Sequence, residues 1–127
     1  MAIAGIGTDI VEVERFSRFI AEDNQTLLQR LFTANELAYA LPRKCAAQHL
    51  AARFACKEAF VKALGLGMRD GMTWHDIEVV RDDLGCPSLT LTGRAAEIFA
   101  QRQLQAHHVS YSHETRWAVA TVIVEGV

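Results

Sequence analysis

Hydrophobic residues recur at helical spacing through the middle of the chain and at strand spacing toward both of its ends. Helices are predicted at residues 12–20, 26–32, 48–64 and 94–106, and a further helix is capped by Thr33 and closed by Pro42. Strands are predicted at residues 2–9, 77–81, 88–92, 108–112 and 117–124. The order of these elements predicts a single α+β domain over residues 1–127, in which a mostly antiparallel sheet packs around a long central helix.

The first and last predicted strands have distinctive patterns. Gly5 and Gly7 interrupt the first strand, and they indicate a close backbone approach to another strand or to a ligand. They do not form a dinucleotide-binding fingerprint, because the third glycine of that motif is missing. The strand at residues 117–124 is apolar on both faces, so we expect it to be central in its sheet or covered by a partner.

The central helix is apolar, yet it carries four charged residues. One stripe at helical spacing contains Leu50, Phe54, Val61 and Leu64, and five alanines keep the remaining surface small. Gly65 ends the helix, since glycine tolerates the left-handed backbone geometry that ends helices. The charged residues are Arg53, Lys57, Glu58 and Lys62, and Lys57 lies at the centre of the apolar stripe. Charges buried in such a helix require a partner or a ligand.

Composition narrows the classes of function. The chain has 127 residues, of which 50% are hydrophobic and two are proline, so one folded domain with a substantial core is expected. A net charge of -2 disfavours a general nucleic-acid binder, because such proteins usually present a strongly basic face. No apolar run approaches the roughly 20 residues that span a bilayer, and no signal peptide precedes the first strand. We therefore expect a cytoplasmic protein without a membrane partner.

The three cysteines, Cys45, Cys56 and Cys86, are predicted to be free thiols. Their number is odd and no two of them are closely spaced. Cys45 and His49 have the spacing of two metal ligands, but no second pair completes a zinc site.

Two acidic residues have contexts that suggest chemistry. Asp9 ends the first apolar strand, and Glu58 sits inside the alanine-rich helix. Two carboxylates that converge in a confined place repel each other, so one of them binds a proton unless a divalent cation neutralises both. Oxygen ligands favour magnesium, which typically takes one or two carboxylates together with substrate phosphate oxygens. With Lys57 and Lys62 nearby, the pattern suits phosphoryl-type transfer to or from a polyanionic substrate.

Simpler structural roles also fit these residues. Glu58 and Lys62 are four residues apart in the order that favours a helix salt bridge worth roughly 0.2–0.5 kcal/mol. Asp9 also fits a turn residue or a cap of the following helix. Thr33 and Glu36 have the spacing of a capping box, which by itself accounts for Glu36. The periodicity leaves open whether Asp9 and Glu58 meet.

His113 stands at the end of the strand predicted at residues 108–112. Of the five histidines it has the best position for acid–base chemistry or for a phosphate contact, and a solvated turn histidine is the alternative. A serine-histidine-acid triad through Ser110 or Ser112 lacks a nucleophile elbow and is disfavoured.

Several stretches taken together resemble a known family. They are residues 5–11 (GIGTDIV), 32–36 (FTANE), 53–59 (RFACKEA), 62–67 (KALGLG) and 109–113 (VSYSH), with a glycine-proline turn at residues 85–87. In a chain of this length they resemble the holo-[acyl-carrier-protein] synthases, the short bacterial 4'-phosphopantetheinyl transferases. The similarity runs along nearly the whole chain. Cys56 and Tyr111 depart from the usual residues, and neither is a proposed metal ligand.

The resemblance implies an activity in fatty acid biosynthesis. The phosphopantetheine arm of coenzyme A moves to a serine of apo acyl carrier protein, which yields the holo carrier and adenosine 3',5'-bisphosphate. Residues matching Asp9 and Glu58 hold a magnesium ion, and Glu58, directly or through a water on the metal, helps to deprotonate the serine. Lys62 stabilises the departing phosphate. The expected contacts to coenzyme A phosphates are Arg53, Lys57, Lys62 and His113.

The resemblance also implies an assembly and a docking surface. The family forms trimers with each active site at a subunit boundary, which agrees with a last strand that is apolar on both faces. Acyl carrier proteins are acidic, so Arg15 and Arg18 on the exposed side of the first helix are the expected docking residues; a solvated helix face is the alternative.

Two other classes of function compete with the enzyme hypothesis. A non-catalytic module that binds coenzyme A or an acyl carrier protein would not need both Asp9 and Glu58 beside lysines. A structural oligomerisation domain would leave the charges of the central helix unexplained.

Overall fold

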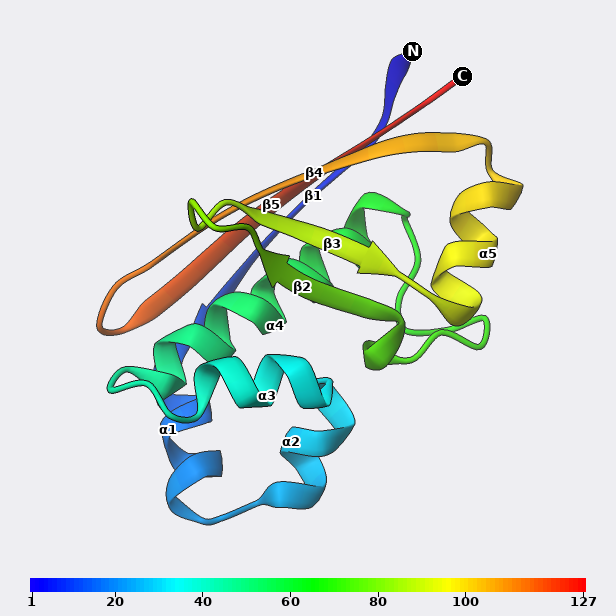
Figure 1. Cartoon of the computed structure of the whole chain (residues 1–127). Helices are drawn as coiled ribbons and strands as arrows, with labels where there is room; N and C mark the ends of the chain where they lie inside the picture. The colour runs from blue at the N-terminus through cyan, green and yellow to red at the C-terminus, as the bar shows by residue number, and fades with distance from the viewer.

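Two antiparallel sheets and five α-helices make up the structure, a computed structural model that describes all 127 residues (Figure 1). Along the chain these elements are β1 (Ala2–Glu12), α1 (Val13–Ala21), α2 (Gln25–Leu31), α3 (Ala34–Ala40), α4 (Ala46–Ala63), the 3-10 helix η1 (Trp74–Asp76), β2 (Ile77–Arg81), β3 (Pro87–Leu91), α5 (Gly93–Gln101), β4 (Leu104–His113) and β5 (Trp117–Gly126). The predicted α+β class is confirmed. The antiparallel strands form two separate sheets, however, rather than one.

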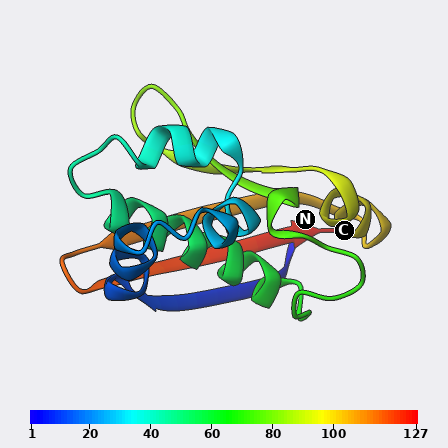
Figure 2. The ribbon, with the colours of Figure 1, turned by 90° about the horizontal axis from the view of Figure 1, so that it is seen from below.

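The larger sheet has the strand order β1-β5-β4 and packs on α4. The prediction that the last strand is central in its sheet is confirmed. Its buried side chains alternate along the strand and face α4; they are Ala118, Ala120, Val122 and Val124. Figure 1 shows α4 along one face of this sheet and no element over the opposite face. From below, α4 crosses the sheet obliquely, from the β4 side at its start to the β1 side at its end (Figure 2).

Gly5 and Gly7 allow β1 to lie directly against α4. A Cβ atom at Gly7 would lie 2.0 Å from the carbonyl oxygen of Ala59, and one at Gly5 would lie 2.0 Å from that of Ala63. No side chain fits at such distances, and alanines on the facing side of α4 keep the helix surface low. The close backbone approach expected from the glycines is therefore present, but its partner is the central helix rather than the strand or ligand that the sequence suggested.

The helices α1 and α2 are anchored to α4 by aromatic packing. The ring of Phe16 in α1 lies 5.8 Å from that of Phe32, just after α2, and 5.7 Å from that of Phe54 in α4. All three side chains are buried. This packing fixes α1 beside α4, directly after the end of β1.

The region after α5 differs from its prediction. The sequence predicts a helix as far as residue 106, but α5 ends at Gln101 and β4 begins at Leu104. Gln103 adopts a left-handed backbone conformation, with φ of 59°, which ends the helix. Leu104 then pairs with Gly126 of β5, so β4 extends from there to His113. No helix of the structure is both long and apolar enough to cross a bilayer.

Candidate active site

Asp9, Glu58 and Lys62 come together where β1 meets the second half of α4. The Nζ atom of Lys62 lies 2.8 Å from Oδ1 of Asp9 and donates a second hydrogen bond, of 3.1 Å, to the carbonyl oxygen of Thr8. The Asp9 carboxylate is close enough to Glu58 for its charge to raise the pKa of that side chain. The question that the sequence left open is therefore answered, because Asp9 and Glu58 lie near each other. Asp9 does not end its strand as predicted, since β1 continues to Glu12.

The structure does not show the simpler roles that the sequence left open for these residues. Lys62 pairs with Asp9 across the β1–α4 contact, and it forms no salt bridge with Glu58 along the helix. Asp9 lies within β1, and the residue at the N-cap of α1 is Glu12. The acidic pair is thus held by tertiary packing rather than by local helix geometry.

The electrostatic environment favours proton transfer at Glu58. Burial raises the pKa of Glu58 and the Asp9 carboxylate raises it further, whereas the charges of Lys62 and Arg15 lower it. A carboxylate whose pKa is closer to the working pH is a better general base. The hydrogen bond from Lys62 to Asp9 raises the pKa of Lys62, so this ammonium group stays charged.

The donor set suits a metal ion that is shared with a substrate. Asp9 and Glu58 supply two carboxylates, and no cluster of three or more metal-binding side chains is present in the structure. The ammonium group of Lys62 at Asp9 shows that a positive charge is accommodated beside these carboxylates. Magnesium commonly takes one or two carboxylates and completes its shell with water and phosphate oxygens. The residues present therefore fit a magnesium ion.

Lys57 is not positioned for the phosphate contact expected of it. Its Nζ atom lies 2.7 Å from Oε1 of Glu36 and donates a hydrogen bond of 2.9 Å to the carbonyl oxygen of Trp74, and both members of the ion pair are fully buried. Burial lowers the pKa of Lys57, while the adjacent Glu36 carboxylate opposes that shift. The Lys57 side chain has no exposed surface for a ligand, so it has a structural role rather than the expected contact to coenzyme A.

Glu36 does more than cap a helix. The predicted capping box is present, because Glu36 accepts a hydrogen bond from the backbone of Thr33 and Thr33 accepts one from the backbone of Glu36. The second carboxylate oxygen of Glu36 accepts a hydrogen bond of 2.9 Å from the backbone nitrogen of Val79. With Lys57 as its ion-pair partner, this one carboxylate joins α3 to both α4 and β2.

We expect Glu36→Ala to lower the free energy of unfolding by about 3–5 kcal/mol, because it leaves the buried Lys57 charge without its partner. Chemical denaturation followed by circular dichroism measures this effect. The double replacement of Glu36 and Lys57 by methionine should cost less than Glu36→Ala, since it removes both charges. If Glu36→Ala lowers the free energy of unfolding by less than about 1 kcal/mol, the Glu36–Lys57 pair does not stabilise the fold in this way.

A second, basic site lies on the other side of α4. A cavity of about 370 Å³ is lined by Arg53, Tyr39 and Arg81, and its lining also includes the acidic residues Glu36, Asp82 and Asp83. The name basic site refers here to the two guanidinium groups. The Arg53 guanidinium group stacks over the Tyr39 ring at 4.3 Å, and Nη1 of Arg81 donates a hydrogen bond of 2.7 Å to the Tyr39 hydroxyl. The Nε atom of Arg53 is buried and has no hydrogen-bond partner. This arrangement suits an anionic group of a ligand, as expected for Arg53.

His113 belongs to the same basic site. It ends β4, and its Nδ1 atom lies 3.1 Å from Oε1 of Gln48. Burial lowers the pKa of His113, and the charges of Arg81 and Arg53 lower it further. The side chain is half-buried beside two guanidinium groups, so the alternative of a solvated turn histidine is wrong.

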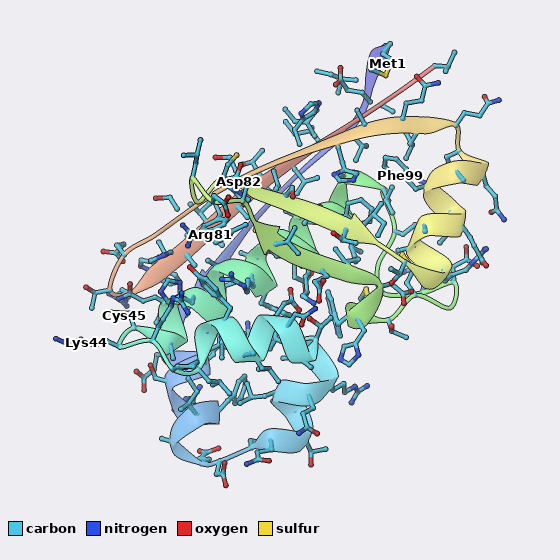
Figure 3. The ribbon with its side chains drawn as sticks, in the orientation of Figure 1. Met1, Lys44, Cys45, Arg81, Asp82 and Phe99 are labelled. Carbon is cyan, nitrogen blue, oxygen red and sulfur yellow. The ribbon has the colours of Figure 1, made fainter.

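The acidic site and the basic site lie at different edges of the larger sheet. Asp9 is on the edge strand β1 and His113 is on the edge strand β4, with β5 between them. Figure 3 shows Arg81 and Asp82 at the same end of the molecule as Lys44 and Cys45, which precede α4. The charges that shift the pKa of Glu58 and those that shift the pKa of His113 are different residues. Within one chain, these are two separate electrostatic sites.

Arg15 and Arg18 are both exposed on α1, as the sequence predicts. The Arg15 guanidinium group lies 5.7 Å from the centre of the Phe54 ring, and its charge lowers the pKa of Glu58. A partner that contacts this part of α1 therefore comes near the acidic site.

Sequence reasoning missed Tyr39 and Arg81 as residues of the basic site. Forty-two positions separate them along the chain, and only the packing of α3 beside the β2–β3 hairpin brings them together. No local pattern marks either residue.

Comparison with known proteins agrees with this geometry. Residues 5–122 match the family model of the 4'-phosphopantetheinyl transferase superfamily. The chain is 56% identical over 123 residues to a holo-[acyl-carrier-protein] synthase of Trichlorobacter lovleyi, which covers 97% of this chain and 98% of that protein. It is 51% identical, with the same coverage, to the holo-[acyl-carrier-protein] synthase of Geotalea daltonii.

Solved structures give the same result. The holo-[acyl-carrier-protein] synthase of Neisseria meningitidis superposes with a TM-score of 0.87 at 32% identity, covering 97% of this chain and 98% of that one. The synthase of Bacillus anthracis, solved in complex with coenzyme A (3',5'-ADP), superposes with a TM-score of 0.81 at 33% identity over the full length of both chains. Because the match in sequence and the match in fold both extend across the acidic and the basic site, the chain belongs to the 4'-phosphopantetheinyl transferase superfamily.

Proposed function

We propose that the protein transfers the 4'-phosphopantetheine group of coenzyme A to a serine hydroxyl of an apo acyl carrier protein. The observation that carries the proposal is the meeting of Asp9, Glu58 and Lys62 at the β1–α4 contact, in a chain that matches holo-[acyl-carrier-protein] synthases over nearly its whole length. A similar protein from Helicobacter pylori has been solved in complex with coenzyme A, with a TM-score of 0.82. These findings support coenzyme A as the donor.

The transfer assigns a separate task to each residue of the acidic site. The serine Oγ forms a bond to the phosphorus that carries pantetheine, and the bond from that phosphorus to the bridging oxygen breaks. The proton of the serine goes to Glu58, whose raised pKa suits a general base. Lys62 neutralises the phosphate oxygen of the departing adenosine 3',5'-bisphosphate. Asp9 and Glu58 would hold a magnesium ion, which when bound would supply positive charge to the phosphoryl oxygens.

The basic cavity is the proposed site for the remaining phosphate of coenzyme A. Arg53 and His113 are the contacts that the sequence suggests, and Tyr39 and Arg81 are added by the geometry. Arg53 lines the cavity and its Nε atom lacks a hydrogen-bond partner, but only 2% of the residue is exposed, so Arg81 is the more accessible of the two guanidinium groups. Lys57 is excluded because it is paired with Glu36.

The uncovered apolar face of the larger sheet supports a homo-oligomer, and the resemblance to the family makes a homotrimer the proposed form. Ile6 and Ile10 on β1 have 64% and 62% of their surfaces exposed, and they pair across the strands with Ile123 and Val119 of β5. A second copy that covers this apolar face also resolves the separation of the two sites. The acidic site of one subunit would meet the basic cavity of its neighbour, so that coenzyme A lies at the boundary.

We expect Ile6→Asp to dissociate the trimer, since each interface then contains a buried and unpaired carboxylate. Native mass spectrometry and light scattering report the mass of the assembly. Leu41, which is 43% exposed at the end of α3, provides the control Leu41→Asp, which should leave the mass of the assembly unchanged. A wild-type protein that is monomeric at micromolar concentration would overturn the assembly.

Arg15 and Arg18 are the proposed docking residues for the acidic carrier protein. Both are exposed, and Arg15 is close enough to Glu58 for its charge to lower the pKa of that side chain. A carrier protein bound to α1 would thus present its serine beside the general base.

The proposed function is tested by the nucleotide product. The protein is incubated with coenzyme A and apo acyl carrier protein, and adenosine 3',5'-bisphosphate is quantified by chromatography with magnesium and with excess chelator. We expect product in stoichiometric amounts with magnesium and a loss of at least a hundredfold in rate with chelator. Binding of coenzyme A without product would favour the non-catalytic module, and an undiminished rate in chelator would remove the metal from the mechanism.

A further inference from the structure

We propose that Lys62 and a divalent cation compete for the Asp9 carboxylate, and that the phosphates of coenzyme A relieve this competition by taking Lys62. The inference rests on the metal site of the proposed function. It adds a coupling between metal and coenzyme A binding that is built into one side chain.

The geometry makes Lys62 the resident cation of Asp9. Its ammonium group has two acceptors, Oδ1 of Asp9 at 2.8 Å and the carbonyl oxygen of Thr8 at 3.1 Å, and both belong to β1. The Asp9 side chain is 16% exposed, whereas that of Lys62 is 53% exposed. Lys62 therefore covers the open side of a carboxylate that the fold otherwise encloses.

A cation that binds between Asp9 and Glu58 meets this ammonium group. A single and a double positive charge about 5 Å apart repel each other enough, even at the dielectric constant of water, to weaken binding by about tenfold. No second lysine or arginine forms an ion pair with Asp9 or Glu58, so Lys62 is the dominant source of this repulsion. The protein without coenzyme A is thus a weak binder of divalent cations.

Phosphate groups change this balance because Lys62 is free to move. Its side chain is long and half-exposed, and its only bonds are to Asp9 and to Thr8. A pyrophosphate beside the site offers the ammonium group a more highly charged acceptor than one carboxylate. When Lys62 turns to the phosphates, Asp9 becomes available to the metal. By thermodynamic reciprocity, the metal must then strengthen coenzyme A binding by the same factor.

Manganese binding tests the competition without any turnover. Mn²⁺ is titrated into the full-length protein, and free Mn²⁺ is followed by its electron paramagnetic resonance signal. We expect Lys62→Met to bind Mn²⁺ about tenfold more tightly than wild type at low ionic strength. Arg30→Gln is the matched control: it removes one exposed positive charge that forms no ion pair, and it should leave the affinity unchanged.

The same titration with saturating coenzyme A tests the coupling. Coenzyme A should tighten Mn²⁺ binding several-fold more in wild type than in Lys62→Met; binding of Mn²⁺ by free coenzyme A is common to both and cancels. Unchanged or weaker Mn²⁺ binding in Lys62→Met overturns the competition while leaving the metal site intact. Asp9→Asn separates the competition hypothesis from the metal site on which it rests. If Asp9→Asn still binds Mn²⁺, or if no variant binds Mn²⁺, the metal site itself is overturned.

Discussion

Glu58→Gln and Asp9→Asn are each expected to slow modification of the carrier protein by about 10²–10⁴-fold. Glutamine cannot accept the proton of the serine, and asparagine cannot supply a negative charge to a metal ion. The rate is measured as holo carrier formed per minute under saturating coenzyme A. The two variants should differ in one respect: raising the magnesium concentration recovers part of the rate in Asp9→Asn but not in Glu58→Gln.

Folding controls separate this loss from a loss of structure. Burial and Asp9 raise the pKa of Glu58, so between its ordinary value and the raised value the folded protein holds more protons than the unfolded chain. In that window the free energy of unfolding falls as the pH rises. Glu58→Gln lacks this decrease, so at neutral pH it should be as stable as wild type or more stable, by less than about 1 kcal/mol because water screens the site.

A matched acidic residue outside the site provides the activity control. Glu97 is exposed on α5 and pairs only with Arg94. Glu97→Gln should keep the wild-type rate. A rate in Glu58→Gln within about threefold of wild type would remove Glu58 from the chemistry, because general-base catalysis typically contributes at least a hundredfold.

Gly7→Ala is expected to lower the free energy of unfolding by more than about 3 kcal/mol, because overpacking at backbone contacts has few ways to relax. The new Cβ atom would lie 2.0 Å from the carbonyl oxygen of Ala59 and 2.6 Å from the backbone nitrogen of Ala63. To accommodate it, β1 must move away from α4, which also separates Asp9 from Glu58. Gly7→Ala should therefore lower both the melting temperature and the rate of carrier modification.

Gly67→Ala is the control for this substitution. A Cβ atom at Gly67 would meet only the side chain of Arg69, at 3.6 Å, so its stability should be near that of wild type. Wild-type stability in Gly7→Ala would contradict the close β1–α4 contact on which the acidic site depends.

The residues of the acidic site could be named from their local contexts, but the meeting of Asp9 and Glu58 could not be predicted, because they belong to segments far apart in the sequence. Glycines on the strand and alanines on the helix are the residues that a close backbone contact requires, and the fold uses them for that contact. The capping box of Thr33 and Glu36 could also be predicted, since it spans four residues. The other partners of Glu36, Lys57 and the backbone of Val79, could not be predicted, because they come from distant segments.

The errors have a common physical origin in long-range packing. A helical wheel places Lys57 on a buried stripe but does not show what lies opposite, so the sequence predicts a phosphate contact where the structure has a buried ion pair with Glu36. The helix predicted to residue 106 gave way to β4, because strand pairing with β5 outweighs a weak local preference. The Tyr39–Arg81 contact depends on the packing of a hairpin against a helix, which no sequence period reveals.

Transfer of phosphopantetheine to a carrier protein through the acidic site changes the mass of the carrier. We would measure the intact mass of an apo acyl carrier protein after incubation with coenzyme A, magnesium and the enzyme. With wild-type enzyme we predict that the carrier gains the mass of one phosphopantetheine group on its serine, and that with Glu58→Gln it remains unmodified over the same period. A carrier whose mass never changes with the wild-type enzyme, or changes equally with both, would contradict the account.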